Sequence, residues 1–127
     1  MNNFKIIFIS SIIIIFIDLF YLTLIGGPIF SKTVKRIQND DMHINITGAI
    51  LSYLLIIITI NKFIILEDKT PSEAFILGFC IYGIFDFTNL AIFKKYDFFT
   101  AIIDMIWGGI LFYITTFLTY KINCIKL

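Results

Sequence analysis

The sequence predicts an all-α fold, a four-helix transmembrane bundle with a short interfacial helix between spans one and two. Of its 127 residues, 59% are hydrophobic and only 15% are charged. A soluble domain has roughly 45–50% apolar and about 25% charged residues, so this composition favours a membrane protein. The charges are gathered in short segments between long apolar runs. We therefore expect a single integral membrane domain over residues 1–127, with no separate soluble domain.

Four apolar runs are long enough to cross a bilayer as helices. A spanning helix needs about 20 predominantly apolar residues, and lipid offers no hydrogen-bond partner to free backbone groups. The predicted spans cover residues 4–25, 44–66, 72–93 and 98–120. The first run is longer than the apolar region of a signal peptide, about 7–15 residues, and it contains Asp18. We interpret it as a retained span.

The segment after the first span predicts a break and then an interfacial helix. Gly26-Gly27-Pro28 combines the two residue types that interrupt helices, so we expect the first helix to end there. Beyond it, Phe30, Val34 and Ile37 share one helical face, and the basic residues lie elsewhere. This pattern is typical of an amphipathic helix lying along the membrane surface.

Local signals also mark the last two spans. Thr70-Pro71-Ser72-Glu73 predicts a capping box with proline at the first helical position of span three. Asp97 predicts an N-cap for span four, and the short link before it predicts a tight antiparallel hairpin. Tyr96 and Tyr120 stand beside lysines, so we expect both at headgroup level.

Membrane orientation is not decided by the basic residues. We call side A the face with the N-terminus, the loop between spans two and three, and the C-terminus; side B is the opposite face. Each face carries five basic residues, so the positive-inside rule does not assign an orientation. We expect a multi-pass integral membrane protein with both termini on one side, and we favour the cytoplasm for them.

Three aspartates, Asp18, Asp86 and Asp104, lie inside the predicted spans. A charged side chain at the centre of a spanning helix costs about 2.5–3.5 kcal/mol, so such residues mark candidate functional sites. Counted from the span ends at 1.5 Å per residue, all three lie about 9–11 Å below the side-B surface. If these helix faces turn inward, the three carboxyl groups converge.

The helical faces of these aspartates carry further polar and aromatic residues. The candidate ligand- or proton-binding residues are Asp18, Asp86, Asn89, Asp104, Trp107, Tyr21 and Tyr82. At the matching depth span two offers Thr47, Gly48 and Ser52, and His43 reads as an interfacial polar residue. By contrast, we expect the side-A half of the bundle to be plain apolar helix.

The aspartates have no basic partner at their depth, because all lysines and the arginine are terminal or in loops. Protons, a metal ion or a cationic ligand must then neutralise them, and crowding favours a proton on at least one. No cofactor motif is evident; a divalent metal is a candidate, with Asp18, Asp86 and Asp104 as its ligands. The competing interpretation is structural: cross-helix hydrogen bonds worth about 0.6 kcal/mol each.

Three strings occur in order along the spans: Asp18-Leu19 in span one, YGIFDFTNLA at 82–91 in span three and DMIWG at 104–108 in span four. In this combination the chain resembles, over essentially its whole length, a family of small membrane proteins, domain of unknown function 2177. The resemblance implies four helices and a membrane location. It also supports the choice of Asp18, Asp86, Asn89, Asp104 and Trp107, and it supplies no established activity.

Three functions remain open at this stage, and the sequence does not decide whether the protein is an enzyme. The first is binding or moving a proton, a cation or a small cationic ligand at the aspartates. The second is a membrane-embedded enzyme that acts on a lipid or isoprenoid, with carboxylates as acid, base or metal ligands. The third is an accessory subunit of a membrane complex. The expected partners are the lipid bilayer and a second copy or another membrane protein; the near-zero net charge of +1 argues against nucleic acid.

Overall fold

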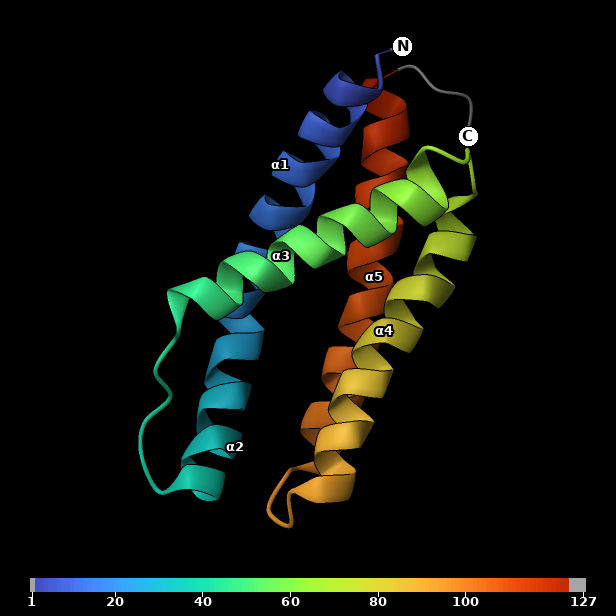
Figure 1. The fold of residues 1–127 in the computed structure, drawn as a ribbon. Coiled ribbons are helices and arrows are strands. Elements are labelled where there is room, and N and C mark those ends of the chain that lie inside the picture. Colours follow the sequence, from blue (N-terminus) through green and yellow to red (C-terminus); the bar gives the residue numbers. More distant parts are fainter. Residues whose placement is uncertain (1, 124–127) are drawn as a thin grey trace.

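The computed structural model describes residues 2–123 and confirms the all-α class (Figure 1). In chain order the elements are α1 (Asn3–Tyr21), the π-helical turn η1 (Leu22–Gly26), α2 (Gly27–Gln38), α3 (Ile46–Ile60), the π-helical turn η2 (Asn61–Ile65), α4 (Pro71–Ile92) and α5 (Phe98–Ile122). Four helical segments are long and apolar enough to span a membrane: Asn3–Gln38, Ile46–Ile65, Pro71–Ile92 and Phe98–Ile122. The four-span bundle is therefore the architecture of this chain.

The expected break at Gly26-Gly27-Pro28 is wrong. α1, η1 and α2 form one helical segment of 36 residues, Asn3–Gln38. Pro28 lies in the first turn of α2, where a missing N–H costs least, directly after the wider π-helical turn. Gly27 is wound so tightly that a side-chain carbon there would lie 2.3 Å from the Leu22 carbonyl oxygen. The two glycines thus permit a tight continuation of the helix.

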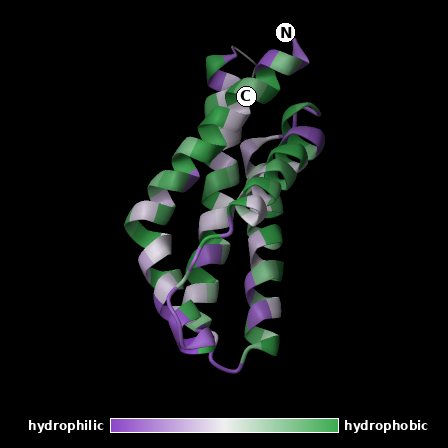
Figure 2. Ribbon diagram, turned by 60° about the vertical axis from the view of Figure 1, so that its left-hand side comes forward, coloured by the Kyte–Doolittle hydropathy of each residue, from purple (hydrophilic) through white to green (hydrophobic). Residues whose placement is uncertain are grey.

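The amphipathic helix expected after span one does form, as α2, but it continues α1 instead of following a break (Figure 1). It ends at Asn39, whose left-handed conformation (φ 56°) is a common helix stop. A 36-residue helix is about 54 Å long, well above the ~30 Å hydrocarbon core, so this segment must tilt or reach the headgroups. Figure 2 shows hydrophilic residues gathered in the linker and turn at the α2 end of the molecule.

α3 crosses the other helices diagonally and ends near the start of α4 (Figure 1). Its far end is held by polar contacts: Ser10 donates to Asn61 Oδ1 at 3.0 Å, and Tyr120 donates to the carbonyl oxygens of Ile64 and Lys69 at 3.3 and 2.6 Å. Tyr120 is 2% exposed. Its side chain is therefore turned into the protein, where its hydroxyl fastens the turn after α3, and its depth at headgroup level stays a prediction.

α4 and α5 form the tight antiparallel hairpin that their short link predicts. The capping box is present, with Thr70 and Glu73 bonding each other's backbone N–H groups, and Asp97 accepts from the Thr100 N–H at 3.2 Å as the N-cap of α5. A side-chain carbon on Gly108 would lie 2.3 Å from the Tyr82 ring. The absent side chain lets the two helices approach closely, as small residues do in membranes.

We predict that Gly108→Ala loosens this hairpin, because the added carbon overlaps the Tyr82 ring. Overpacking of this kind costs about 1–3 kcal/mol. The matched control is Gly48→Ala on α3, where the nearest atom to an added carbon is 3.9 Å away. Thermal unfolding in detergent should show a lower Tm for the Gly108 variant alone. Equal Tm values for the two variants would contradict the packing described here.

Candidate functional site

The three aspartates inside the spans all face the interior of the bundle. Asp18 and Asp104 are each 6% exposed, and Asp86 is fully buried. On α1 the cause is a regular stripe, because the buried residues Ile6, Ser10, Ile14 and Asp18 recur every four positions. Three different helices therefore turn a carboxyl group inward.

Asp18 is held by donors from two other helices. Tyr53 of α3 donates its hydroxyl to Asp18 Oδ2 at 2.5 Å, and Trp107 of α5 donates its indole N–H to Oδ1 at 2.9 Å. The Tyr21 ring stacks on Trp107 with 4.3 Å between ring centroids. Both carboxyl oxygens of Asp18 therefore accept a hydrogen bond from another helix.

Asp86 and Asp104 form a second centre, in which the two carboxyl groups are close enough to interact electrostatically. Tyr96 donates to Asp86 Oδ1 at 2.7 Å, and Asp86 Oδ2 is buried without a hydrogen-bond partner. Two carboxylates close together in a low-dielectric interior repel each other, and a proton on either one relieves that repulsion. The unpartnered Asp86 Oδ2 is therefore a buried acceptor open to a proton or another donor.

The two centres belong to one cluster. The Asp104 carboxyl group is within electrostatic range of Asp18 as well as of Asp86. The Tyr21 hydroxyl is within range of all three aspartates, and Tyr82 is within range of Asp18 and Asp104. We call this set the acid cluster: Asp18, Asp86 and Asp104 with Tyr21, Tyr53, Tyr82, Tyr96 and Trp107. Asn89 is at its edge, with its side chain against the Tyr96 hydroxyl.

The acid cluster has no cationic partner in the part of the chain that the structure describes. The ion pair recorded there is Lys35 with Asp41, at 3.5 Å and well exposed. Within residues 2–123 no three histidine, cysteine, aspartate or glutamate side chains are arranged to hold a metal ion. A divalent metal at Asp18, Asp86 and Asp104 stays a prediction.

Two tyrosines of the acid cluster, Tyr53 and Tyr96, were not predicted from the sequence. The expectation for α3 was Thr47, Gly48 and Ser52, but these residues are exposed, and Tyr53 is the one that reaches Asp18. The diagonal course of α3 decides which face turns inward, and no local pattern encodes it. Tyr96 was expected among the headgroups, yet it is 8% exposed.

Tyr96 acts as a fixed donor between the hairpin turn and α4. Burial, together with the hydrogen bond to Asp86, raises the pKa of Tyr96 above its ordinary value. The hydroxyl therefore keeps its proton and donates a hydrogen bond to the Asp86 carboxyl group. The sequence does contain a signal for this contact. Tyr96 follows Asp86 by ten residues, and the short turn between α4 and α5 allows the two side chains to meet.

The side-A half of the bundle is not plain apolar helix, which corrects the expectation for it. Thr115, Thr116, Thr119 and Asn123 of α5 are buried, and each has a side-chain oxygen without a hydrogen-bond partner. Other threonines behave differently: Thr23, Thr33 and Thr59 donate to the carbonyl oxygen four residues earlier. We call the four α5 residues the polar column. Leu111 and Phe112, both fully buried, lie between it and Asp104 along the helix.

An apolar groove flanks the acid cluster on one side. It has a volume of about 340 Å³ and is lined by Phe16, Phe20 and Leu24 of the first helical segment together with Tyr21 and Trp107. Its walls are almost entirely carbon, and residues around it such as Phe16 and Leu24 are largely exposed on the outer surface. In a membrane this surface meets lipid.

Comparison with known families places the chain. Residues 3–121 match the family described as "Predicted membrane protein (DUF2177)". No curated protein and no solved structure matches the chain. The matched range includes the four membrane-spanning segments and all three aspartates. The chain thus belongs to the DUF2177 family of membrane proteins, as an integral protein that crosses the bilayer several times.

Proposed function

We propose that this protein binds protons at the Asp86–Asp104 pair and moves them through the bundle. The observation that carries the proposal is the burial of three carboxyl groups, on Asp18, Asp86 and Asp104, none of which is paired with a basic side chain among the described residues. Because each uncompensated charge in a membrane interior costs about 2.5–3.5 kcal/mol, such a site favours binding of a proton or small cation.

The hydrogen-bond donors divide the roles among the aspartates. Asp18 receives donors from Tyr53 and Trp107, and Asp86 receives one from Tyr96. Among the described residues no tyrosine or tryptophan donates to Asp104. Donors stabilise the ionised form, so Asp104 is the member of the cluster on which the proton is best placed. Asp86 then accepts a hydrogen bond from the protonated Asp104.

The polar column supports movement in addition to binding. It continues the inner face of α5 from the acid cluster towards side A, with Leu111 and Phe112 as an apolar barrier between them. Buried hydroxyl groups left without partners cost about 1–3 kcal/mol each, so they favour water or another polar guest. Polar groups on both sides of a thin apolar barrier form an arrangement suited to transfer in two steps.

A second candidate function is an enzyme that acts on a lipid or isoprenoid. The observation in its favour is the apolar groove beside Tyr21 and Trp107, which would place a chain in lipid contact next to the acid cluster. In this case a carboxyl group of the cluster serves as general acid or base.

For the proton function, Asp104→Asn is the decisive variant. It keeps the size of the side chain and removes the acid, so proton flux into liposomes that contain the purified protein should fall at least about tenfold. The control is Asp97→Asn, which also removes one carboxylate but keeps a good N-cap for α5. Circular dichroism should show both variants folded. Undiminished flux in Asp104→Asn, or an equal loss in the control, would refute the proposal.

Replacing residues of the polar column tests proton transfer separately from folding. Thr115→Val and Thr119→Val remove hydroxyl groups that have no partner, so we expect an unchanged or higher Tm together with lower proton flux. The matched control is Thr59→Val, whose hydroxyl donates to the Leu55 carbonyl oxygen near the outer face of α3. If the column serves only to bond helices together, the first two variants will lower Tm and leave the flux unchanged.

The lipid-enzyme function is tested by a separate measurement, the conversion of lipids by the protein. Leu24→Trp would fill the apolar groove from its outer wall, and Leu24 is 60% exposed, so the fold should tolerate the change. Mass spectrometry of lipids incubated with the protein should then show a conversion that is lost in this variant, with proton flux retained. Absence of any lipid conversion by the unmodified protein would eliminate this candidate.

A further inference from the structure

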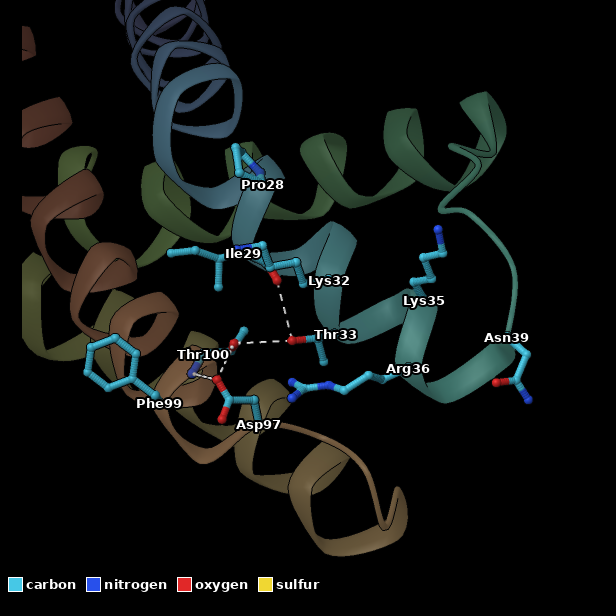
Figure 3. Close-up of a pocket in the computed structure, with 10 residues that line it drawn as sticks. All are labelled: Pro28, Ile29, Lys32, Thr33, Lys35, Arg36, Asn39, Asp97, Phe99 and Thr100. Atoms are coloured by element: carbon cyan, nitrogen blue, oxygen red, sulfur yellow. Dashed lines mark hydrogen bonds between the residues drawn. The ribbon is translucent and has the colours of Figure 1, made fainter.

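A second, differently charged cavity lies at the side-B end of the bundle. It has a volume of about 730 Å³ and is formed by α2 and the first turn of α5 (Figure 3). Three basic residues of α2, Lys32, Lys35 and Arg36, line it together with the apolar side chains of Pro28, Ile29 and Phe99. A cavity lined by both cationic and apolar side chains suits an amphiphile with a negative headgroup.

The positive charge of this cavity is largely uncompensated. Lys35 pairs with Asp41 at 3.5 Å, but the two side chains are 69% and 74% exposed, and such pairs are weak. Within residues 2–123 neither Lys32 nor Arg36 takes part in an ion pair. The guanidinium group of Arg36 extends into the space between α2 and α5 (Figure 3).

Asp97, the one acid on the cavity wall, is engaged elsewhere. Its carboxylate accepts from the Thr100 hydroxyl at 2.9 Å and from the Thr100 N–H at 3.2 Å, as the cap of α5. These hydrogen bonds are the main reason why the pKa of Asp97 lies below its ordinary value, and Arg36 adds only a smaller effect. Asp97 therefore already has its own donors, and Lys32 and Arg36 have no ion-pair partner among the described residues.

The two walls are fixed to each other at the base of the cavity. The hydroxyl groups of Thr33 on α2 and Thr100 on α5 lie 3.2 Å apart in a hydrogen bond, and both residues are 1% exposed (Figure 3). The spacing between the α2 and α5 walls of the cavity is thus set by a buried contact. A ligand would meet a preformed site, which lowers the cost of binding.

We propose that this cavity binds the phosphate group of an anionic phospholipid from the side-B leaflet. Basic pockets between membrane helices commonly hold lipid headgroups, and the planar guanidinium of arginine matches phosphate oxygens in pairs. The acyl chains would leave along Phe99, which is 67% exposed at the membrane edge of the cavity. The site is separate from the acid cluster and does not depend on a proton role.

Native mass spectrometry of the full chain in detergent, titrated with phosphatidylglycerol or with phosphatidylcholine, tests this site. The double variant Lys32→Gln/Arg36→Gln should weaken phosphatidylglycerol binding roughly tenfold or more. The control is Lys94→Gln/Lys95→Gln, which removes the same charge from the same end of the molecule, outside the cavity lining. The control should bind as the unmodified protein does.

Three results would overturn the proposal. Equal losses in the two double variants would mean that general surface charge attracts the lipid, with no defined site. Equal binding of the two lipids by the unmodified protein would mean that the basic residues do not select a negative headgroup. Calorimetry with inorganic phosphate should show binding at least tenfold weaker than the lipid; binding of equal strength would reject a lipid ligand in favour of free phosphate.

Discussion

Two carboxyl groups, on Asp86 of α4 and Asp104 of α5, are buried together inside the hairpin, and the surrounding structure follows from keeping them there. Like charges close together in a low-dielectric interior repel strongly, and our proposal is that one shared proton relieves this repulsion. The close approach of the helices requires Gly108 opposite the Tyr82 ring, and the short turn after α4 allows Tyr96 to reach back to Asp86. The hairpin is therefore both the most tightly packed part of the bundle and the part that holds the chemistry.

Around this pair the remaining elements act as a frame of donors. α1 brings Asp18, α3 brings Tyr53, and Trp107, stacked on Tyr21, donates to Asp18 from α5. The resulting cluster is polar in its centre and apolar on its lipid side, where the groove lies. The basic cavity near α2 has the opposite charge and a separate location, and the Thr33–Thr100 contact closes it at its base. One small bundle thus presents an acidic interior and a basic edge.

Local chemistry was enough to predict much of this fold. Apolar length predicted four spans, Thr70 to Glu73 predicted the start of α4, and Asp97 predicted the start of α5. The rise per residue placed three aspartates at one level, and the structure turns all three inward. Other features depend on geometry that short patterns do not carry. The tilt of α3 selects Tyr53 over Ser52, and a π-helical turn carries the chain through Gly26-Gly27-Pro28. Buried threonines of the polar column look unremarkable in an apolar helix, because threonine usually bonds its own backbone there.

The central claim is that Asp86 and Asp104 hold one proton between them at neutral pH. Infrared spectroscopy of the protein in liposomes measures it directly, through the C=O stretching band that only a protonated carboxyl group gives. Our account predicts such a band at neutral pH, removed by Asp86→Asn and by Asp104→Asn, and retained in Asp18→Asn. A spectrum without this band, or a band that survives both substitutions in the pair, would contradict the account.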